Sequence, residues 1–191
     1  MKRRTFDLIM TGVGALLTLA LLVAGGLLTW GATFTTSTVH DQLAQQQIFF
    51  PPKSAFEHPV AGSEITPSMI PSVSQYAGQQ LLTGQQAEVW ANDFIAVHLK
   101  EIGGGKTYAT LSAESQADPS NTALANQVNL IFRGTTLKGL LLEAYAFSIF
   151  GTIALISSIC CWILAALMLI LTLLGYNHYR KTPEDREFPK A

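Results

Sequence analysis

The chain has 191 residues, of which 49% are hydrophobic and 13% are charged, and its formal net charge is −1. Soluble globular domains carry about 25% charged residues, so this composition argues against an ordinary soluble globule and favours a membrane protein. The only two cysteines, Cys160 and Cys161, are adjacent, which excludes a disulfide framework of the kind that stabilises small secreted domains.

Residues 1–7 form a short basic start, and residues 8–30 contain no charged side chain. As a helix, this uncharged run would be about 35 Å long, enough to cross a hydrocarbon core of about 30 Å. It exceeds the roughly 7–15 apolar residues of a signal-peptide core, and no Ala-x-Ala cleavage site is evident. We therefore expect residues 8–30 to be retained as a first transmembrane helix rather than cleaved as a signal peptide.

Residues 31–143 separate this run from a second apolar run. They begin with a polar, Thr- and Gln-rich stretch that is expected to continue the first helix for a few turns. Five prolines between residues 48 and 72 then predict an irregular segment, because proline lacks the amide hydrogen that helices and sheets need. Four apolar side chains are expected to pack this segment against the helices: Ile48, Phe49, Phe50 and Phe56. The alternative is that Phe49 and Phe50 dip into the membrane interface.

Helical patterns follow the proline-rich segment. One helix is expected from Val73 to a break at Gly84. A second is expected over residues 85–102, where apolar residues recur at helical spacing. A third is expected to end at Gly134, followed by a last helix, capped by Thr135 or Thr136, that runs into the second apolar run. Runs of alternating β-branched residues are absent from the sequence, so we predict an all-α fold.

The sequence "GGGKT", residues 103–107, resembles the end of a phosphate-binding loop. In such a loop the first glycine would stand at position 100, which is Lys100, and a strand rather than a helical pattern would precede it. The glycines are better interpreted as the end of the preceding helix, because glycine adopts the left-handed backbone without strain. The sequence therefore predicts no nucleotide partner here.

Residues 144–175 form the second uncharged run, and its 32 positions exceed one crossing. We expect its N-terminal part to stand above the bilayer, or the helix to tilt strongly. Lysines and arginines gather in both tails, 1–7 and 176–191, whereas residues 31–143 carry five basic and nine acidic residues. By the positive-inside rule, both termini are predicted to be cytoplasmic and residues 31–143 extracytoplasmic.

Small or polar residues recur along one face of each predicted span. Such residues let membrane helices approach closely, since lipid provides no hydrophobic drive for their association. The first span carries Gly14, Thr18, Gly25 and Thr29, and the second carries Ala154, Ser158, Cys161, Ala165 and Thr172, with Met168 filling the gap. Either the two spans pack on each other, or these faces pack against another membrane protein or a second copy of the chain.

Residues for chemistry are scarce. The cysteines read as small apolar residues of the second span, and the pair His98 and Glu101 lacks the further ligands that a metal site needs. A Gly-x-Ser-x-Gly elbow is absent from the sequence, and no spacing selects a pair of carboxylates. We therefore predict no catalytic, cofactor-binding or metal-binding residues, no cofactor and no nucleic-acid partner. Four aromatic residues form either a core or an apolar pocket: Tyr76, Trp90, Phe94 and Tyr108.

The chain resembles an uncharacterised family of actinobacterial two-span membrane proteins with an extracytoplasmic helical domain. The resemblance is strongest in "QQIFFPP", residues 46–52, and in "FRGTTLKGLLLEAYAF", residues 132–147. It implies a multi-pass protein of the bacterial cytoplasmic membrane. On these grounds we expect a two-helix hairpin that carries a small helical domain and acts as a non-catalytic accessory or scaffolding subunit of an envelope complex. The alternative is an extracytoplasmic sensor or carrier of a lipid or small ligand.

Overall fold

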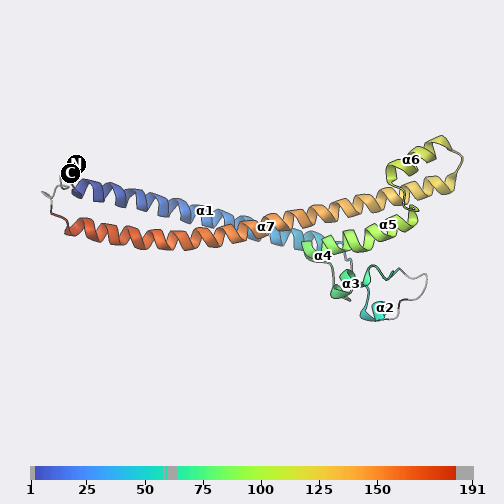
Figure 1. The fold of residues 1–191 in the computed structure, drawn as a ribbon, viewed down its shortest axis with the longest axis horizontal. Helices are drawn as coiled ribbons and strands as arrows, with labels where there is room; N and C mark the ends of the chain where they lie inside the picture. Colours follow the sequence, from blue (N-terminus) through green and yellow to red (C-terminus); the bar gives the residue numbers. More distant parts are fainter. Residues whose placement is uncertain (1–2, 58, 60–63, 184–191) are drawn as a thin grey trace. The chain divides into compact units, whose positions relative to one another are not determined.

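The computed structural model describes residues 3–57, 59 and 64–183 (Figure 1). All the regular elements of these residues are helical, apart from one isolated antiparallel bridge between Phe49 and Gln80, which confirms the predicted all-α class. In chain order the elements are α1 (Arg3–Gln45), α2 (Lys53–Glu57), α3 (Ile70–Val73), the 3-10 helix η1 (Ser74–Tyr76), α4 (Gly84–Val89), the π-helix η2 (Trp90–Ile95), α5 (Ala96–Ile102), α6 (Tyr108–Ala117) and α7 (Thr122–Lys181).

The chain divides into two compact units. One comprises Met1–Phe34 with Gly151–Ala191, and the other comprises Thr35–Phe150. We call the first the two-helix unit, since its described residues belong almost entirely to α1 and α7, and the second the small-helix unit.

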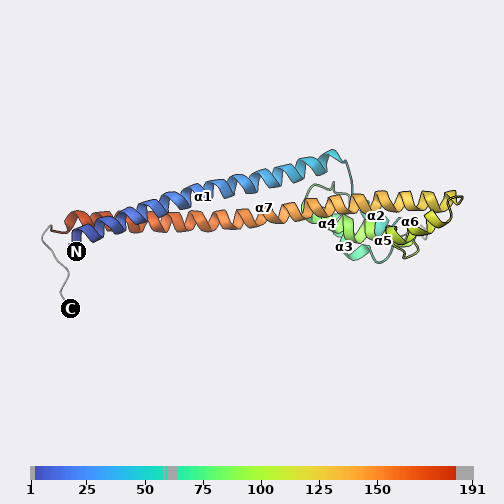
Figure 2. The ribbon, with the colours of Figure 1, turned by 90° about the horizontal axis from the view of Figure 1, so that it is seen from above.

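The helices α1 and α7 are both long and apolar enough to cross a membrane, which confirms the two predicted apolar helices. In the two-helix unit they lie side by side and run in opposite directions (Figures 1 and 2). Most of their large apolar side chains point away from the neighbouring helix, as expected of helices whose outer surface lipid would cover. The predicted continuation of the first helix is also confirmed, because α1 ends only at Gln45.

The contact between the two helices follows a heptad repeat. Side chains that are buried or half-buried in the two-helix unit recur at alternating spacings of three and four residues. On α1 they include Arg4, Asp7, Thr11, Gly14, Thr18, Leu21, Gly25, Leu28 and Ala32, and on α7 they include Ala154, Ser158, Cys161, Ala165, Met168, Thr172, Gly175, Tyr179 and Thr182. A period of 3.5 residues keeps one seam facing the partner, as in a left-handed coiled coil. We call these residues the seam.

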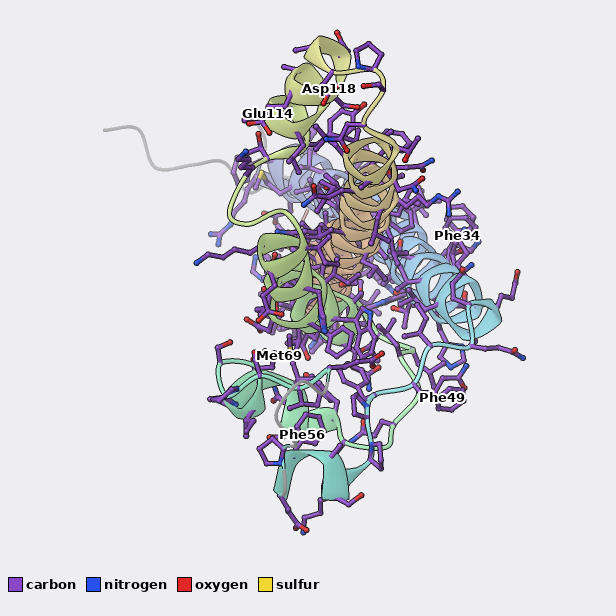
Figure 3. The ribbon with its side chains drawn as sticks, turned by 90° about the vertical axis from the view of Figure 1, so that its right-hand side faces the viewer. Phe34, Phe49, Phe56, Met69, Glu114 and Asp118 are labelled. Atoms are coloured by element: carbon purple, nitrogen blue, oxygen red, sulfur yellow. The ribbon has the colours of Figure 1, made fainter. Side chains whose placement is uncertain are left out.

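The small-helix unit is built around one hydrophobic core. Five core side chains have no exposed area: Met69, Val73, Leu81, Ala87 and Ala91. The proline-rich segment contributes Phe50, which is 2% exposed, and the buried Phe56, whereas Phe49 is 56% exposed (Figure 3). Of the four apolar residues expected to pack this segment, Ile48, Phe50 and Phe56 therefore join the core and Phe49 does not.

The prediction of a helix from Val73 to Gly84 is wrong. After the short helices α3 and η1 the chain turns at Gly78, whose φ is +72°, and then becomes extended. The backbone here pairs with the residues after α1, because the Phe50 amide donates to Gln79 O over 2.8 Å and the Leu81 amide donates to Ile48 O over 2.9 Å. Tertiary pairing of two irregular segments thus overrides the local helical pattern.

The prediction that a helix ends at Gly134 is also wrong, since α7 runs without interruption from Thr122 to Lys181. A side chain at position 134 would collide with the Leu99 side chain, so the glycine allows α5 and α7 to pack closely. Gly84 has the same role beside Tyr145 and Ser148 of α7. The sequence signal was real, but it marked close helix packing rather than the end of a helix.

The glycine-terminated helix before Lys106 is confirmed. The helix that begins with α4 ends at Ile102, and Gly104 and Gly105 then adopt positive φ angles of 58° and 79°. The Gly105 amide donates to Lys100 O over 2.8 Å, which satisfies one of the carbonyls left free at the helix end. The Lys106 ammonium contacts both carboxylate oxygens of Glu114 at 2.7 and 2.8 Å.

Candidate functional site: an interhelical groove

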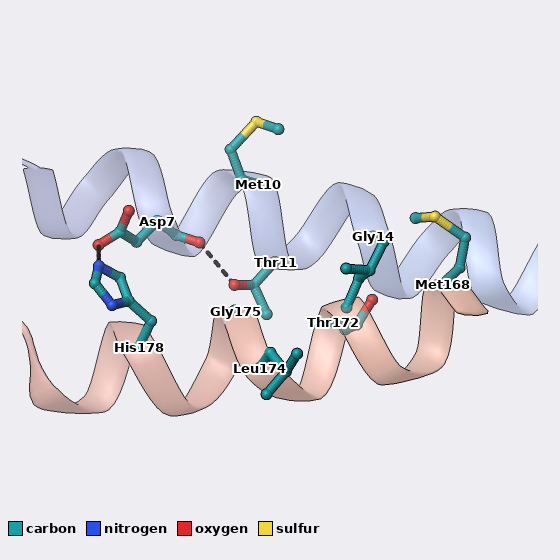
Figure 4. Close-up of a pocket in the computed structure, with 10 residues that line it drawn as sticks. Asp7, Met10, Thr11, Gly14, Met168, Thr172, Leu174, Gly175 and His178 are labelled. Carbon is teal, nitrogen blue, oxygen red and sulfur yellow. Dashed lines mark hydrogen bonds and ion pairs between the residues drawn. The ribbon is translucent and has the colours of Figure 1, made fainter. Parts of the chain in front are cut away.

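A groove of about 440 Å³ opens between α1 and α7 within the two-helix unit. It lies near the first turns of α1 and the last turns of α7 (Figure 4). Its lining is mostly apolar and includes two glycines. The lining residues are Asp7, Met10, Thr11, Gly14, Met168, Leu171, Thr172, Leu174, Gly175 and His178.

The apolar lining of the groove comes from both helices. Met10 from α1 and Met168, Leu171 and Leu174 from α7 supply the large side chains. Unbranched methionines adapt to irregular shapes, so walls of this kind suit a flexible apolar chain better than a rigid planar ring. Gly175 contributes only backbone to the lining, and a Cβ atom added there would stand 3.2 Å from the Thr11 hydroxyl oxygen.

One end of the groove is polar. The Asp7 carboxylate lies 3.7 Å from His178 Nε2 (Figure 4). The Thr182 hydroxyl lies 3.3 Å from Asp7 Oδ2 and 3.0 Å from His178 O. The Asp7 side chain is only 15% exposed, and both interactions satisfy it there. One turn further out, the Arg4 guanidinium lies over the Tyr179 ring, 5.2 Å from its centroid. These groups connect the beginning of α1 to the end of α7.

The other end of the groove is a tight helix crossing. A Cβ atom added at Gly14 would stand 2.6 Å from Thr172 Oγ1, so only glycine permits this approach. Thr172 Oγ1 is itself buried and has no hydrogen-bond partner within the described part of the chain. Four threonines of α1 instead donate to the carbonyl four residues earlier: Thr11, Thr18, Thr29 and Thr33. The Thr172 hydroxyl faces Gly14 and does not make the corresponding bond within α7.

The residues predicted to mediate helix packing lie at the contact of α1 with α7. Gly25 faces Cys161 and Trp162, and the Trp162 indole donates to the Thr29 hydroxyl over 3.1 Å. Thr18, Ser158 and Ala165 are buried, and Ala154 and Cys161 are half-buried. Within the chain, the two faces therefore pack against each other, which is one of the two alternatives that the sequence left open.

The four predicted aromatic residues do not form one site. Trp90 and Phe94 stack with ring centroids 4.1 Å apart, and Phe50 bridges Trp90 and Tyr76 at 5.0 and 5.2 Å. Tyr108 lies elsewhere, with its ring 5.5 Å from that of Phe132. Trp90 is buried and its neighbours pack on the core, so the geometry favours the core interpretation for Tyr76, Trp90 and Phe94.

The π-helix η2 contains Trp90 and Phe94. Its wider turn brings these residues into a stack and continues the row of rings to His98, whose ring centroid is 4.6 Å from that of Phe94. Single π-turns inside α-helices occur frequently at functional sites. In this unit the aromatic stack joins the hydrophobic core, and His98 Nδ1 lies 2.8 Å from Phe94 O of the same helix.

The sequence patterns do not indicate the polar end of the groove. Asp7 lies within the tail predicted for residues 1–7, and His178 lies within the tail predicted for residues 176–191. The heptad period itself would have found Asp7 and its neighbour Thr182, but not His178, which falls between the heptad positions. Counted back from Gly14 in steps of three and four, it reaches Thr11, Asp7 and Arg4, and counted forward from Thr172 it reaches Gly175, Tyr179 and Thr182.

Among the residues that the structure describes, no three His, Cys, Asp or Glu side chains gather as potential metal ligands. His40 lies 3.2 Å from its neighbour Asp41 on the surface. The structure does not describe His58, nor the tail residues Lys2, Arg186 and Lys190, which contribute to the predicted orientation.

Comparison of the chain with models of protein families, with curated proteins and with solved structures gives no match.

Proposed function

We propose that the protein is a two-span protein of the bacterial cytoplasmic membrane that serves as a non-catalytic accessory or scaffolding subunit of a cell-envelope complex. Both termini would be cytoplasmic and residues 31–143 extracytoplasmic. The two long apolar helices and the basic residues near both chain ends support this topology. The proposal also agrees with the resemblance to actinobacterial two-span membrane proteins.

The observation that carries the proposal is an exposed apolar stripe on α7 within the small-helix unit. It consists of Leu130, Leu137, Leu140 and Phe147, all of them exposed. Residues seven and three positions apart lie on one side of a helix. Apolar side chains gathered in this way along one face of a helix typically mark a surface where another protein binds. We call them the outer stripe.

The spacing of the outer stripe also indicates the kind of partner. Steps of seven, three and seven residues match the heptad seam with which one helix receives another. Arg133, which is exposed, falls within the same stripe. In a parallel pair of two copies this arginine would face its own counterpart, and like charges in that position repel. The partner is therefore a helix of a different membrane protein, with an acidic residue opposite Arg133.

The alternative of an extracytoplasmic ligand carrier receives less support from the same unit. Its core side chains include five with no exposed area, and three of the four aromatic residues proposed for a pocket pack into that core. A binding pocket would need concave space lined by such residues.

Site-specific photocrosslinking in native membranes tests the proposal. A photoreactive phenylalanine analogue placed at Leu137 should give a discrete heterologous product that copurifies through a C-terminal tag. The same analogue at Thr135 is the control, because two residues further back it points about 160° away on the helix. A product of equal yield at both positions, or a product made only of this chain, would contradict the proposal. Mass spectrometry of the product would name the complex.

A further inference from the structure

We infer that the groove between α1 and α7 is a binding site for one acyl chain of an anionic glycerophospholipid, with its phosphate beside the basic turns where α1 begins and α7 ends. The inference concerns the two-helix unit alone. It goes beyond the scaffolding function, which rests on the outer stripe of the small-helix unit, and shares with it only the membrane topology.

The length of the groove fits one leaflet of a bilayer. Between Met168 and His178 the helix rises about 15 Å, and half of a hydrocarbon core of about 30 Å has the same depth. The groove begins beside the last polar turn of α7 and ends where Thr172 and Met168 close on Gly14. A lipid tail entering from the membrane surface would therefore reach the tight helix crossing near the middle of the bilayer.

The lining fits an acyl chain. The large side chains along the groove are methionines and leucines, and the glycines Gly14 and Gly175 add only backbone. A lipid tail gains no hydrophobic energy when it moves from among other tails into the groove. A lipid bound there is therefore retained by close packing and by its headgroup. The headgroup therefore decides which lipid is preferred.

The charges at the polar end favour an anion. The last turn of α7 carries His178, Arg180 and Lys181, and the first turns of α1 carry Arg3 and Arg4. Asp7 is the one carboxylate among the described residues of these turns. Basic pockets between transmembrane helices on the cytoplasmic side are a recurring way to bind anionic lipid headgroups.

The test uses the full-length protein in phosphatidylcholine vesicles with spin-labelled phosphatidylglycerol. The motionally restricted fraction of the label gives its association constant relative to phosphatidylcholine. We expect a preference for phosphatidylglycerol that is lost in Leu174→Trp, because an indole ring that fills the groove displaces the acyl chain that would hold the headgroup beside the basic turns. Leu173→Trp is the matched control, because Leu173 is 59% exposed, Leu174 is 60% exposed, and only Leu174 lines the groove.

A second pair of variants tests the opposite wall. Met10→Trp should reduce the preference in the same way, whereas Ile9→Trp should not, since both side chains are 53% exposed and only Met10 lines the groove. An equal preference in each variant and its control would overturn the inference, because charge attraction at the membrane surface would then explain the binding. An unmodified protein that shows no headgroup preference would overturn it as well. Neither result would affect crosslinking at the outer stripe, which tests the scaffolding function separately.

Discussion

Replacing Phe50 by alanine should destabilise the small-helix unit far more than the same change at the neighbouring Phe49. The Phe50 ring is 2% exposed and contacts the rings of Trp90 and Tyr76 at centroid distances of 5.0 and 5.2 Å. Truncating a buried phenylalanine to alanine costs about 3–5 kcal/mol, because the transfer energy is lost and a cavity remains. Phe49 is 56% exposed, so Phe49→Ala should change the free energy of unfolding by only about 0.5 kcal/mol.

Hydrogen exchange of the full-length protein in lipid nanodiscs measures this difference. Amides of residues 84–102, which include the buried turns of α4 and η2, should exchange roughly two to four orders of magnitude faster in Phe50→Ala. In Phe49→Ala their exchange should stay close to that of the unmodified protein. Similar rates in the two variants would refute the core packing described for the proline-rich segment. They would favour the alternative in which both rings enter the membrane interface.

Two further predictions concern single residues with matched controls. Thr172→Val should raise the stability of the helix pair by about 1 kcal/mol, because it removes a buried hydroxyl without a partner, whereas Thr18→Val should lower it slightly by removing the bond to Gly14 O. Thermal unfolding in detergent, followed by circular dichroism, would show opposite shifts; shifts of the same sign would contradict this reading. Gly105→Ala should cost about 1–2 kcal/mol at its positive φ, whereas Gly139→Ala, inside α7 with open space around it, should stabilise by about 0.5–1 kcal/mol. Equal effects of the two alanines on urea unfolding would count against the glycine turn after α5.

The sequence was sufficient for the features that depend on composition and local pattern. Long uncharged runs predicted the two apolar helices, and three successive glycines predicted the end of the helix before Lys106. The glycine signal depends only on neighbouring residues. An apolar run long enough to cross a bilayer has few alternatives to a helix, because its backbone polar groups must be satisfied within the chain. The small residues along both predicted spans could likewise be found from their spacing alone.

The features that the sequence did not predict depend on contacts between distant segments. Gly134 resembles a helix end until Leu99 is seen to pack against it, and the helical pattern after Val73 yields to backbone pairing with the residues after α1. Asp7 and His178 are separated by most of the chain, and only the antiparallel packing of α1 on α7 brings them together. The heptad spacing identifies the face of each helix that packs against the other. It does not tell which residue of α7 lies opposite which residue of α1.

The most direct test of the account is the side of the membrane on which each segment lies. In a variant with Cys160→Ala and Cys161→Ala, single cysteines would be introduced by Ser120→Cys, between α6 and α7, or by Ala191→Cys at the C-terminus. A membrane-impermeant maleimide applied to intact cells should label the first variant, and it should label the second only after permeabilisation. Labelling of both in intact cells, or of Ala191→Cys alone, would contradict the proposed two-span topology.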